Sequence, residues 1–184
     1  MSRNSEITVT NLQIQDCIAF SKKQSEDNRG TMTRIWSQDE LYKKFKLNQG
    51  SYVSNPISKT LRGLHYQDKP FQENKIVQCI SGRVFDVIVD LRENSKSYRV
   101  SLSLEIGPNS NYQGLFIPSG CAHGYITLEP DSNLIYYMDN SYSPDNCRGI
   151  IWNDSTLGIK WPFNPVIISK QDLQWPELVS LEQK

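Results

Sequence analysis

The stretch Lys75-Ile-Val-Gln-Cys-Ile-Ser-Gly-Arg-Val-Phe-Asp-Val-Ile-Val-Asp-Leu91 decides the fold class of this chain. It contains two runs rich in β-branched residues, Lys75–Ile80 and Arg83–Leu91. In the second run alternate residues carry an apolar side chain, with the period of a β-strand: Phe85, Val87, Val89 and Leu91. Because the turn-forming pair Ser81-Gly82 separates the two runs, we predict that they form a β-hairpin.

The same alternation recurs further along the chain. Leu102, Leu104 and Ile106 alternate with polar residues, and 107–111 then breaks the pattern with glycine, proline, asparagine and serine. Further short strands are predicted at 115–118, 125–128 and 134–138. Many short strands joined by turns favour an all-β fold, an antiparallel barrel or sandwich.

The segments on either side of these strands have different patterns. Ser37-Gln38-Asp39-Glu40 has the form of a capping box, with Leu41 and Phe45 one turn apart behind it, so we predict a helix there. After Tyr142, prolines predict extended segments that wrap over the body from about residue 143. The chain has no internal repeat or flexible linker, which indicates a single domain over 1–184.

Length and charge limit the classes of function. A chain of 184 residues with 38% hydrophobic residues is long enough to bury a core without disulfides or metal. Its net charge is zero, which argues against a sequence-independent nucleic-acid binder. No apolar run approaches the roughly 20 residues of a membrane span, and the N-terminus lacks the apolar core of a signal peptide. We therefore predict a soluble, cytoplasmic protein that binds neither nucleic acid nor membrane.

Histidine and cysteine usage argues against a metal centre. The chain has only two histidines, His65 and His123, so one chain cannot build a three-histidine site. Its four cysteines are scattered without a CxxC pair, and we expect them to be reduced. A metal-dependent cupin oxygenase or isomerase is therefore disfavoured.

The first histidine lies in Thr60-Leu-Arg-Gly-Leu-His-Tyr-Gln67. In a regular strand Arg62 and His65 point to opposite faces, so they reach one site only if Gly63 permits a bulge or if the strand crosses a barrel mouth. The alternative is a strand with a hydrogen-bonded structural histidine.

Other candidate residues are equally ambiguous when each is taken alone. His123 lies among small residues in Pro118–Tyr125, which fits either a close approach to a ligand or a tight turn. Tyr136 and Tyr137 face opposite ways, so one of the two phenols is expected to point into the barrel. Lys75 at the start of a strand and Asp172 in Ser169-Lys-Gln-Asp172 have ordinary structural explanations as well.

Taken together, these segments resemble the dTDP-4-dehydrorhamnose 3,5-epimerase family of nucleotide-sugar epimerases. The resemblance covers about residues 27–172 and rests on 60–67, 82–92, 117–125, 142–149 and 152–162. It implies an isomerase with a cupin-type antiparallel β-barrel, a jelly roll with a few short peripheral helices. It also implies a homodimer that exchanges N-terminal strands, and no metal or other cofactor.

The resemblance also implies a reaction and roles for single residues. The substrate would be a nucleotide-linked 4-keto-6-deoxyhexose, used to make a deoxysugar for the cell surface, such as an O-antigen, or for a secondary metabolite. Four residues match catalytic positions: His65 as base, Asp172 as its carboxylate partner, Tyr136 as acid on the opposite face, and Lys75 beside the developing oxyanion. Five match substrate-binding positions: Arg62, His123 and Ser54 around the sugar and pyrophosphate, Tyr142 near the base, and Arg29 reaching the nucleotide across the dimer.

Two stretches depart from the family pattern. After Arg29-Gly30 the family usually has an aromatic residue, whereas this chain has Thr31-Met-Thr-Arg34, and 54–58 differs as well. Three alternatives stay open on this basis: an epimerase that acts only at C3 or only at C5, one that takes a CDP- or GDP-linked sugar, and a non-catalytic nucleotide-sugar-binding barrel.

Overall fold

The computed structural model describes residues 7–36 and 45–181, and it is built almost entirely from antiparallel strands. The predicted helix at 37–45 lies outside the described residues except for Phe45, which is buried. The elements in chain order are β1 (Ile7–Asn11), β2 (Ile18–Lys22), β3 (Gln24–Asp27), β4 (Gly30–Thr33), β5 (Gln49–Asn55), β6 (Leu61–Gln67), β7 (Lys75–Ser81), β8 (Val84–Asp90), β9 (Ser101–Ile106), β10 (Gly114–Ile117), β11 (Cys121–Thr127), β12 (Ser132–Met138), the 3₁₀ turn η1 (Pro144–Asn146), β13 (Cys147–Gly149) and α1 (Leu178–Leu181).

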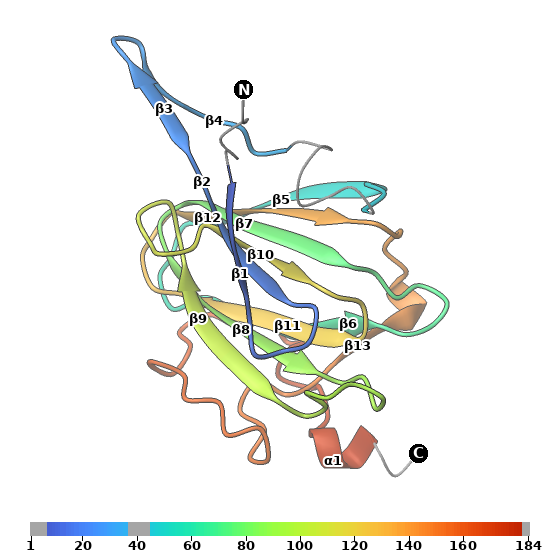
Figure 1. Ribbon diagram of the computed structural model, residues 1–184. Coiled ribbons are helices and arrows are strands. Elements are labelled where there is room, and N and C mark those ends of the chain that lie inside the picture. The colour runs from blue at the N-terminus through green and yellow to red at the C-terminus, as the bar shows by residue number, and fades with distance from the viewer. Residues whose placement is uncertain (1–6, 37–44, 182–184) are drawn as a thin grey trace.

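Two sheets face each other to form the jelly roll that the sequence predicts (Figure 1). The six-stranded sheet has the order β1-β2-β10-β7-β12-β5, and the five-stranded sheet has the order β13-β6-β11-β8-β9. The strands predicted at 101–106, 115–118, 125–128 and 134–138 correspond to β9, β10, β11 and β12. None of the helices in the described part of the chain is long and apolar enough to cross a lipid bilayer.

The predicted hairpin at Ser81-Gly82 is wrong. Both strands exist, but β7 pairs with β10 and β12, whereas β8 pairs with β9 and β11 in the opposite sheet. Gly82 has a φ of +66°, and the next residue, Arg83, donates its N–H to Ser132 Oγ at 3.1 Å. The turn therefore carries the chain from one sheet to the other.

The space between the sheets is divided into an apolar half and a polar half. Buried residues of β2, β8 and β10, such as Ala19, Ile88 and Leu115, fill the first half. The inward positions of β7 and β12 change along each strand, because Val77 and Leu134 join this core whereas Lys75 and Tyr136 line a cavity. Burial also raises the pKa of the Cys79 thiol to about 12.

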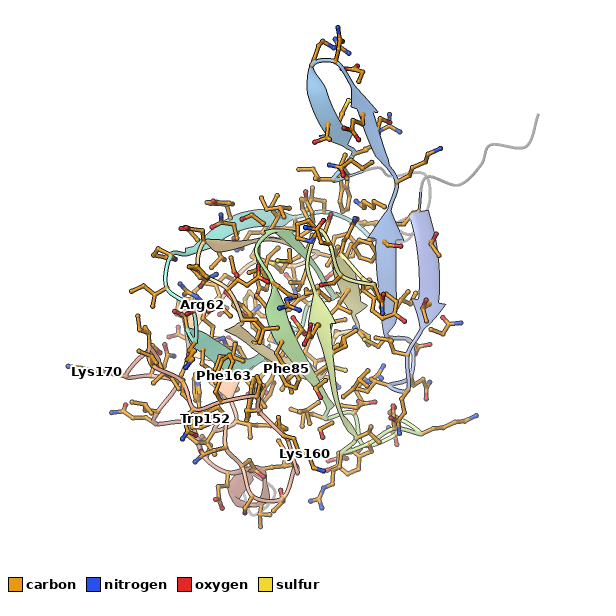
Figure 2. All side chains as sticks on the ribbon, turned by 90° about the vertical axis from the view of Figure 1, so that its left-hand side faces the viewer. Arg62, Phe85, Trp152, Lys160, Phe163 and Lys170 are labelled. Carbon is orange, nitrogen blue, oxygen red and sulfur yellow. The ribbon has the colours of Figure 1, made fainter. Side chains whose placement is uncertain are left out.

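The outer face of the five-stranded sheet is covered by the segment after β13. Val87 and Val89, from the apolar face that identified β8, pack there with Leu157 and Leu178. Figure 2 shows Phe85 among aromatic side chains of this segment, and its ring centroid lies 5.8 Å from that of Trp161. Both faces of β8 are thus buried, one of them under residues of the segment after β13.

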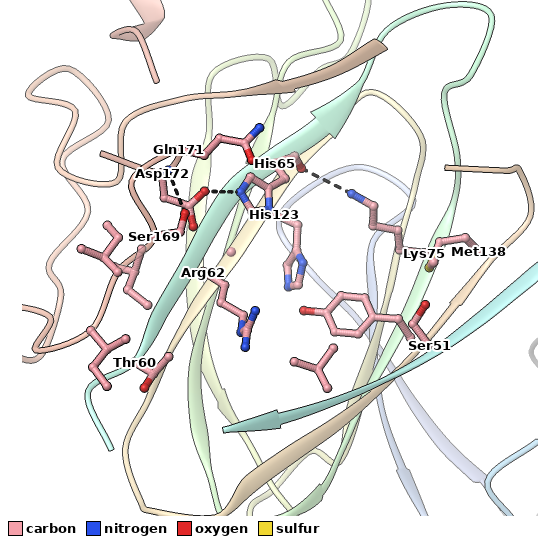
Figure 3. Close-up of a pocket in the computed structure, with 16 residues that line it drawn as sticks. Ser51, Thr60, Arg62, His65, Lys75, His123, Met138, Ser169, Gln171 and Asp172 are labelled. Atoms are coloured by element: carbon pink, nitrogen blue, oxygen red, sulfur yellow. Dashed lines mark hydrogen bonds and ion pairs between the residues drawn. The ribbon is translucent and has the colours of Figure 1, made fainter. Parts of the chain in front are cut away.

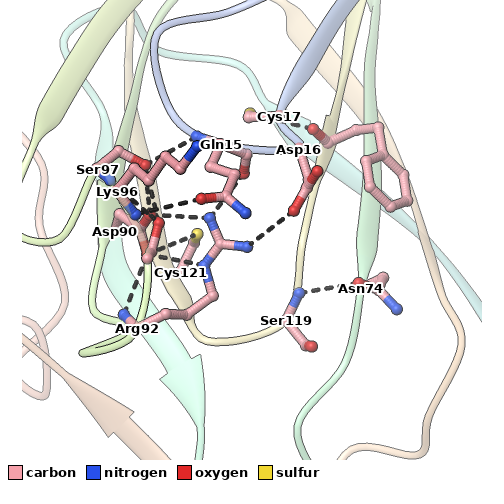
Figure 4. Close-up of polar contacts among 12 residues, drawn as sticks. Gln15, Asp16, Cys17, Asn74, Asp90, Arg92, Lys96, Ser97, Ser119 and Cys121 are labelled. Atoms are coloured by element: carbon pink, nitrogen blue, oxygen red, sulfur yellow. Dashed lines mark hydrogen bonds and ion pairs between the residues drawn. The ribbon is translucent and has the colours of Figure 1, made fainter.

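A buried ion-pair network fastens the turn after β1 to the end of β8 (Figure 4). Arg92 Nε donates to Asp90 Oδ1 at 2.8 Å, and Arg92 Nη2 donates to the carbonyl of Gln15 at 2.6 Å. Burial opposes ionisation of Asp90, but hydrogen bonds from Arg92, Ser95 and Ser97 outweigh it and hold the pKa of this carboxyl well below its usual range. The network therefore anchors the N-terminal strands to the barrel.

The N-terminal strands pair within their own chain. β1 pairs with β2, and β2 pairs with β10. The hairpin of β3 and β4 instead projects away from the barrel in Figure 1, and its strand residues up to Met32 are exposed. Both β1, an exposed edge strand of the six-stranded sheet, and this hairpin are N-terminal segments on the surface of the chain.

Candidate active site

A cavity of about 600 Å³ occupies the polar half of the barrel. Strands of both sheets contribute to it, and the segment 167–172 closes one side. Figure 3 shows Arg62, His65, Lys75, His123 and Asp172 around this space. The structure therefore gathers most of the residues that the sequence singled out.

A bulge in β6 brings Arg62 and His65 to the same cavity. Arg62 is opposite Tyr125 and His65 is opposite His123, so two residues of β6 face the single residue Gly124. Gly63 has a φ of +119°, and a Cβ there would lie 2.5 Å from the Cα of Gly124. Of the two alternatives that the sequence left open, the bulge at Gly63 is the one present, because only glycine fits this close approach of two strands.

His65 is paired with a buried carboxylate. Its Nε2 lies 2.6 Å from Asp172 Oδ1, and the backbone N–H of Gly63 lies 3.3 Å from Asp172 Oδ2. Burial disfavours the charged form of Asp172, but hydrogen bonds from His65, Gly63 and Trp175 outweigh it and lower its pKa. Because an ionised carboxylate only accepts, Nε2 of a neutral His65 carries the hydrogen and Nδ1 has the free lone pair. His65 is therefore arranged as a base.

Lys75 lies beside His65 in a fixed position. Its Nζ forms an ion pair with Glu73 Oε1 at 3.1 Å and donates to the carbonyl oxygen of His65 at 3.4 Å. Glu73 is buried and also accepts a hydrogen bond from the side-chain amide of Gln67. These contacts hold a cation in the cavity wall, where it can stabilise negative charge that develops on a ligand.

The second histidine has a partner that sequence reasoning missed. His123 Nε2 lies 2.8 Å from Asp86 Oδ2, and both side chains are buried. Burial raises the pKa of Asp86, and the neighbouring His123 partly counters that effect. Asp86 had a detectable signal, because it interrupts the apolar run of β8 at a position that points into the barrel.

Tyr136 lies in the opposite sheet from His65 and lines the same cavity. Burial raises the pKa of its phenol well above the usual value, and nearby Tyr125 and Asp86 add to this effect. Tyr136 therefore stays protonated and can act as a proton donor. Tyr137 faces the other side of the sheet, where its ring centroid lies 4.9 Å from that of Trp36, as the alternation of β12 predicts.

Ser54 is a predicted site residue that the structure places on the face of its strand opposite to the cavity. It is exposed on the outer face of β5, while Ser51 and Val53 line the cavity. The reason is the period of two along the strand, which places Ser54 on the face opposite to its neighbours. Ser51 is thus a β5 hydroxyl that lines the cavity.

Two more predicted residues lie outside the main cavity. Tyr142 is 57% exposed and lines an adjoining cavity of about 220 Å³ together with Lys75. Arg29 lies at the tip of the β3–β4 hairpin, where its Nη2 is 2.6 Å from Asp27 Oδ2. Within residues 7–36 and 45–181, the structure places no group of three histidine, cysteine or acidic side chains that would hold a metal ion.

Comparison with known proteins agrees with this geometry. The model of the dTDP-4-dehydrorhamnose 3,5-epimerase family matches residues 11–180. The dTDP-4-dehydrorhamnose 3,5-epimerase of Shigella flexneri is 31% identical over 180 residues, which cover 96% of this chain and 98% of that protein.

Two solved structures share the fold. The dTDP-4-dehydrorhamnose 3,5-epimerase of Bacillus anthracis, solved with TDP and pyrophosphate bound, is 31% identical with a TM-score of 0.88, covering 94% of this chain and 99% of that one. The dTDP-6-deoxy-D-glucose-3,5-epimerase of Legionella pneumophila, solved with dTDP-4-keto-L-rhamnose, is 27% identical with a TM-score of 0.86, covering 96% of each chain. Because sequence and fold agree over nearly the whole length, this chain belongs to the dTDP-4-dehydrorhamnose 3,5-epimerase family of isomerases.

Proposed function

We propose that the protein inverts C3 and C5 of a dTDP-linked 4-keto-6-deoxyhexose, as a step in deoxysugar biosynthesis. The observation that carries this proposal is the placement of a base and an acid on opposite walls of one cavity, with His65 and Asp172 on one side and Tyr136 on the other. Inversion needs this arrangement, because the proton must leave one face of a carbon and return to the other.

The reaction uses the acidity that the C4 ketone confers on its neighbours. His65 Nδ1 takes the proton from C3 or C5, and the electron pair of the broken C–H bond moves onto the ketone oxygen as an enolate. Lys75 stabilises the negative oxygen, and the Asp172 carboxylate stabilises the imidazolium. Tyr136 then gives its phenolic proton to the opposite face of the carbon and regains a proton from solvent, while the His65 imidazolium releases the abstracted proton to solvent, so that both groups return to their starting state. No cofactor is needed for this sequence.

The nucleotide part of the substrate has a separate set of candidate contacts. Arg62 lines the cavity and donates from Nε to Asn55 Oδ1 at 2.9 Å, which leaves its terminal nitrogens for a phosphate. His123 would contact the sugar, and Tyr142 in the adjoining cavity would stack on the base. Since nucleotide-linked sugars are cytoplasmic metabolites, the proposal also places the enzyme in the cytoplasm.

The test is hydrogen exchange in D₂O, with dTDP-, CDP- and GDP-4-keto-6-deoxyhexoses supplied in turn. We expect deuterium at both C3 and C5, with the dTDP-linked sugar reacting fastest, and NMR of the recovered sugar reads both positions. Deuterium at only one of the two carbons would show that the enzyme epimerises that carbon alone. Faster exchange with a CDP- or GDP-linked sugar would overturn the dTDP assignment. No exchange with any of the three would leave a non-catalytic sugar-binding barrel.

We also propose that Arg29 completes the nucleotide site of a second subunit in a homodimer. The projecting hairpin supports this role, because the Arg29 side chain is 84% exposed at a tip that points away from its own barrel (Figure 1). An arginine contributed from a partner is suited to bidentate binding of a phosphate.

Mixing two variants, each altered at a different residue of the site, tests the dimer. Arg29→Ala is expected to raise KM and His65→Asn to abolish turnover, each as a pure protein. After unfolding and refolding together, about half of the dimers would be mixed and carry one site with both residues intact. We expect activity at low substrate concentration to reappear in the mixture. No recovery, with dimers present by sedimentation, would show that Arg29 does not act across the dimer.

A further inference from the structure

The indole of Trp175 lies against the His65–Asp172 pair. Its Nε1–H donates to Asp172 Oδ1 at 3.2 Å, the same oxygen that His65 Nε2 contacts at 2.6 Å. The indole also meets the His65 ring edge-on, with 6.2 Å between ring centroids and 70° between ring planes. We propose that Trp175 is a positioning residue with two effects. It holds the His65 ring against Asp172, and its N–H competes with His65 for the negative charge on Asp172 Oδ1.

The indole is itself held in place by the backbone around it. Gly149 of β13 is paired with His65 of β6, and a Cβ at Gly149 would collide with the indole of Trp175. The next residue is fixed as well, because the Pro176 carbonyl accepts the N–H of Ile151 at 3.0 Å. Strand β13 therefore pairs with the His65 strand and, at Gly149, leaves the space that the Trp175 indole occupies. One strand thus positions both rings.

Sharing of Asp172 Oδ1 has a chemical consequence. A carboxylate oxygen that accepts from two donors holds less negative charge for each of them. Without the indole N–H, Oδ1 would accept from His65 alone and would stabilise the imidazolium more strongly. Removing this donor while keeping an aromatic ring is thus expected to make His65 more basic.

Other charged groups near His65 form a background that this substitution leaves intact. Besides Asp172, the charged and titratable groups around it are Lys75 with its partner Glu73 on the β7 side, Arg62 on β6, and the hydrogen-bonded side chains of His123 on β11 and Asp86 on β8. Four further groups stay neutral in the pH range where a histidine titrates, because burial raises the pKa of each. They are Tyr136 on β12, Tyr66 on β6, Cys147 on β13, and Tyr142.

The experiment uses the fact that the chain has only two histidines. In ¹⁵N-labelled protein each imidazole is followed by NMR across pH 4–9, in wild type and in Trp175→Phe. We expect the His65 midpoint to rise by about half a pH unit or more in this variant, while that of His123 stays unchanged. Trp161→Phe is the matched control, because Trp161 Nε1 donates to the backbone carbonyl of Trp152 at 2.8 Å. It should move neither midpoint.

An unchanged His65 midpoint in Trp175→Phe, or an equal rise in Trp161→Phe, would overturn the inference. If Trp175→Phe does not fold, wild type provides a second measurement. In wild-type protein, the chemical shift of the Trp175 Nε1–H should then change with pH at the same midpoint as His65. A chemical shift that stays constant through this pH range would overturn the inference equally.

The consequence for catalysis rests on the proposed function. In Trp175→Phe, the acidic limb of the pH profile of kcat/KM should move upward together with the His65 midpoint. If the midpoint moves and the limb does not, His65 is not the base that limits the rate, and the proposed mechanism fails while the role of Trp175 stands. The two failures are therefore distinguishable.

Discussion

His65→Asn is expected to lower kcat about 10³-fold or more and to remove deuterium exchange at both C3 and C5. Asparagine offers no nitrogen lone pair that accepts a proton, and its shorter side chain also loses the contact that His65 Nε2 makes with Asp172 at 2.6 Å. Abstraction is the first chemical step, so exchange and inversion should fall together. Both are measured in D₂O, from the deuterium content and the configuration of the recovered sugar.

Ser54→Ala is the control for this substitution. Ser54 is exposed on the outer face of β5 and does not line the cavity, so its hydroxyl should be dispensable in its own subunit. We expect this variant to keep both signals near the wild-type level. Exchange that persists in His65→Asn would assign the base to another group, and His123 with its partner Asp86 would be the next candidate.

Tyr136→Phe is expected to separate exchange from inversion. Loss of the phenolic proton removes protonation on the far face and should lower net inversion about 10²-fold. The base on the near face survives, so His65 still exchanges the substrate proton with solvent and returns it to the same face. The ratio of deuterium incorporation to inverted product should therefore rise, and one NMR time course gives both quantities.

The neighbouring tyrosine provides a matched control. Tyr137 has the same side chain one residue along β12 but packs on the outer face of the sheet against Trp36. Tyr137→Phe removes the same hydroxyl from the same strand, and we expect exchange and inversion to keep their wild-type ratio. An equal loss of both signals in Tyr136→Phe would contradict its assignment as the acid.

Strand positions were predicted well from local pattern, and strand partners were not. Alternation located β8, β9 and β12, because the period of two is a property of neighbouring residues. The turn at Ser81-Gly82 was misread, because the same residues serve a hairpin and a crossover between sheets. A hairpin is distinguished from a crossover only by the strands that pair with β7, and these lie far along the chain at 114–117 and 132–138.

The candidate site shows the same division. His65, Lys75, Tyr136 and Asp172 were identified through the family resemblance, and the cavity brings them together. The placement of Ser54 on the outer face and the Asp86–His123 pair emerged only from the structure. Asp86 lies 37 residues from His123 along the chain, and a contact at that separation leaves no local pattern.

The resemblance of five motifs indicated the family. The residue pattern by itself determined an all-β chain with two histidines, in which Gly63 could permit a bulge. Those conclusions depend on residue type and on short-range period, which are readable without a fold. The tertiary structure alone decided that Arg62 and His65 share a cavity, and that Trp175 and Asp172 come from the C-terminal segment to meet His65. The physical reason is that these contacts join residues about 110 positions apart, where pairing depends on how two sheets close around a common core.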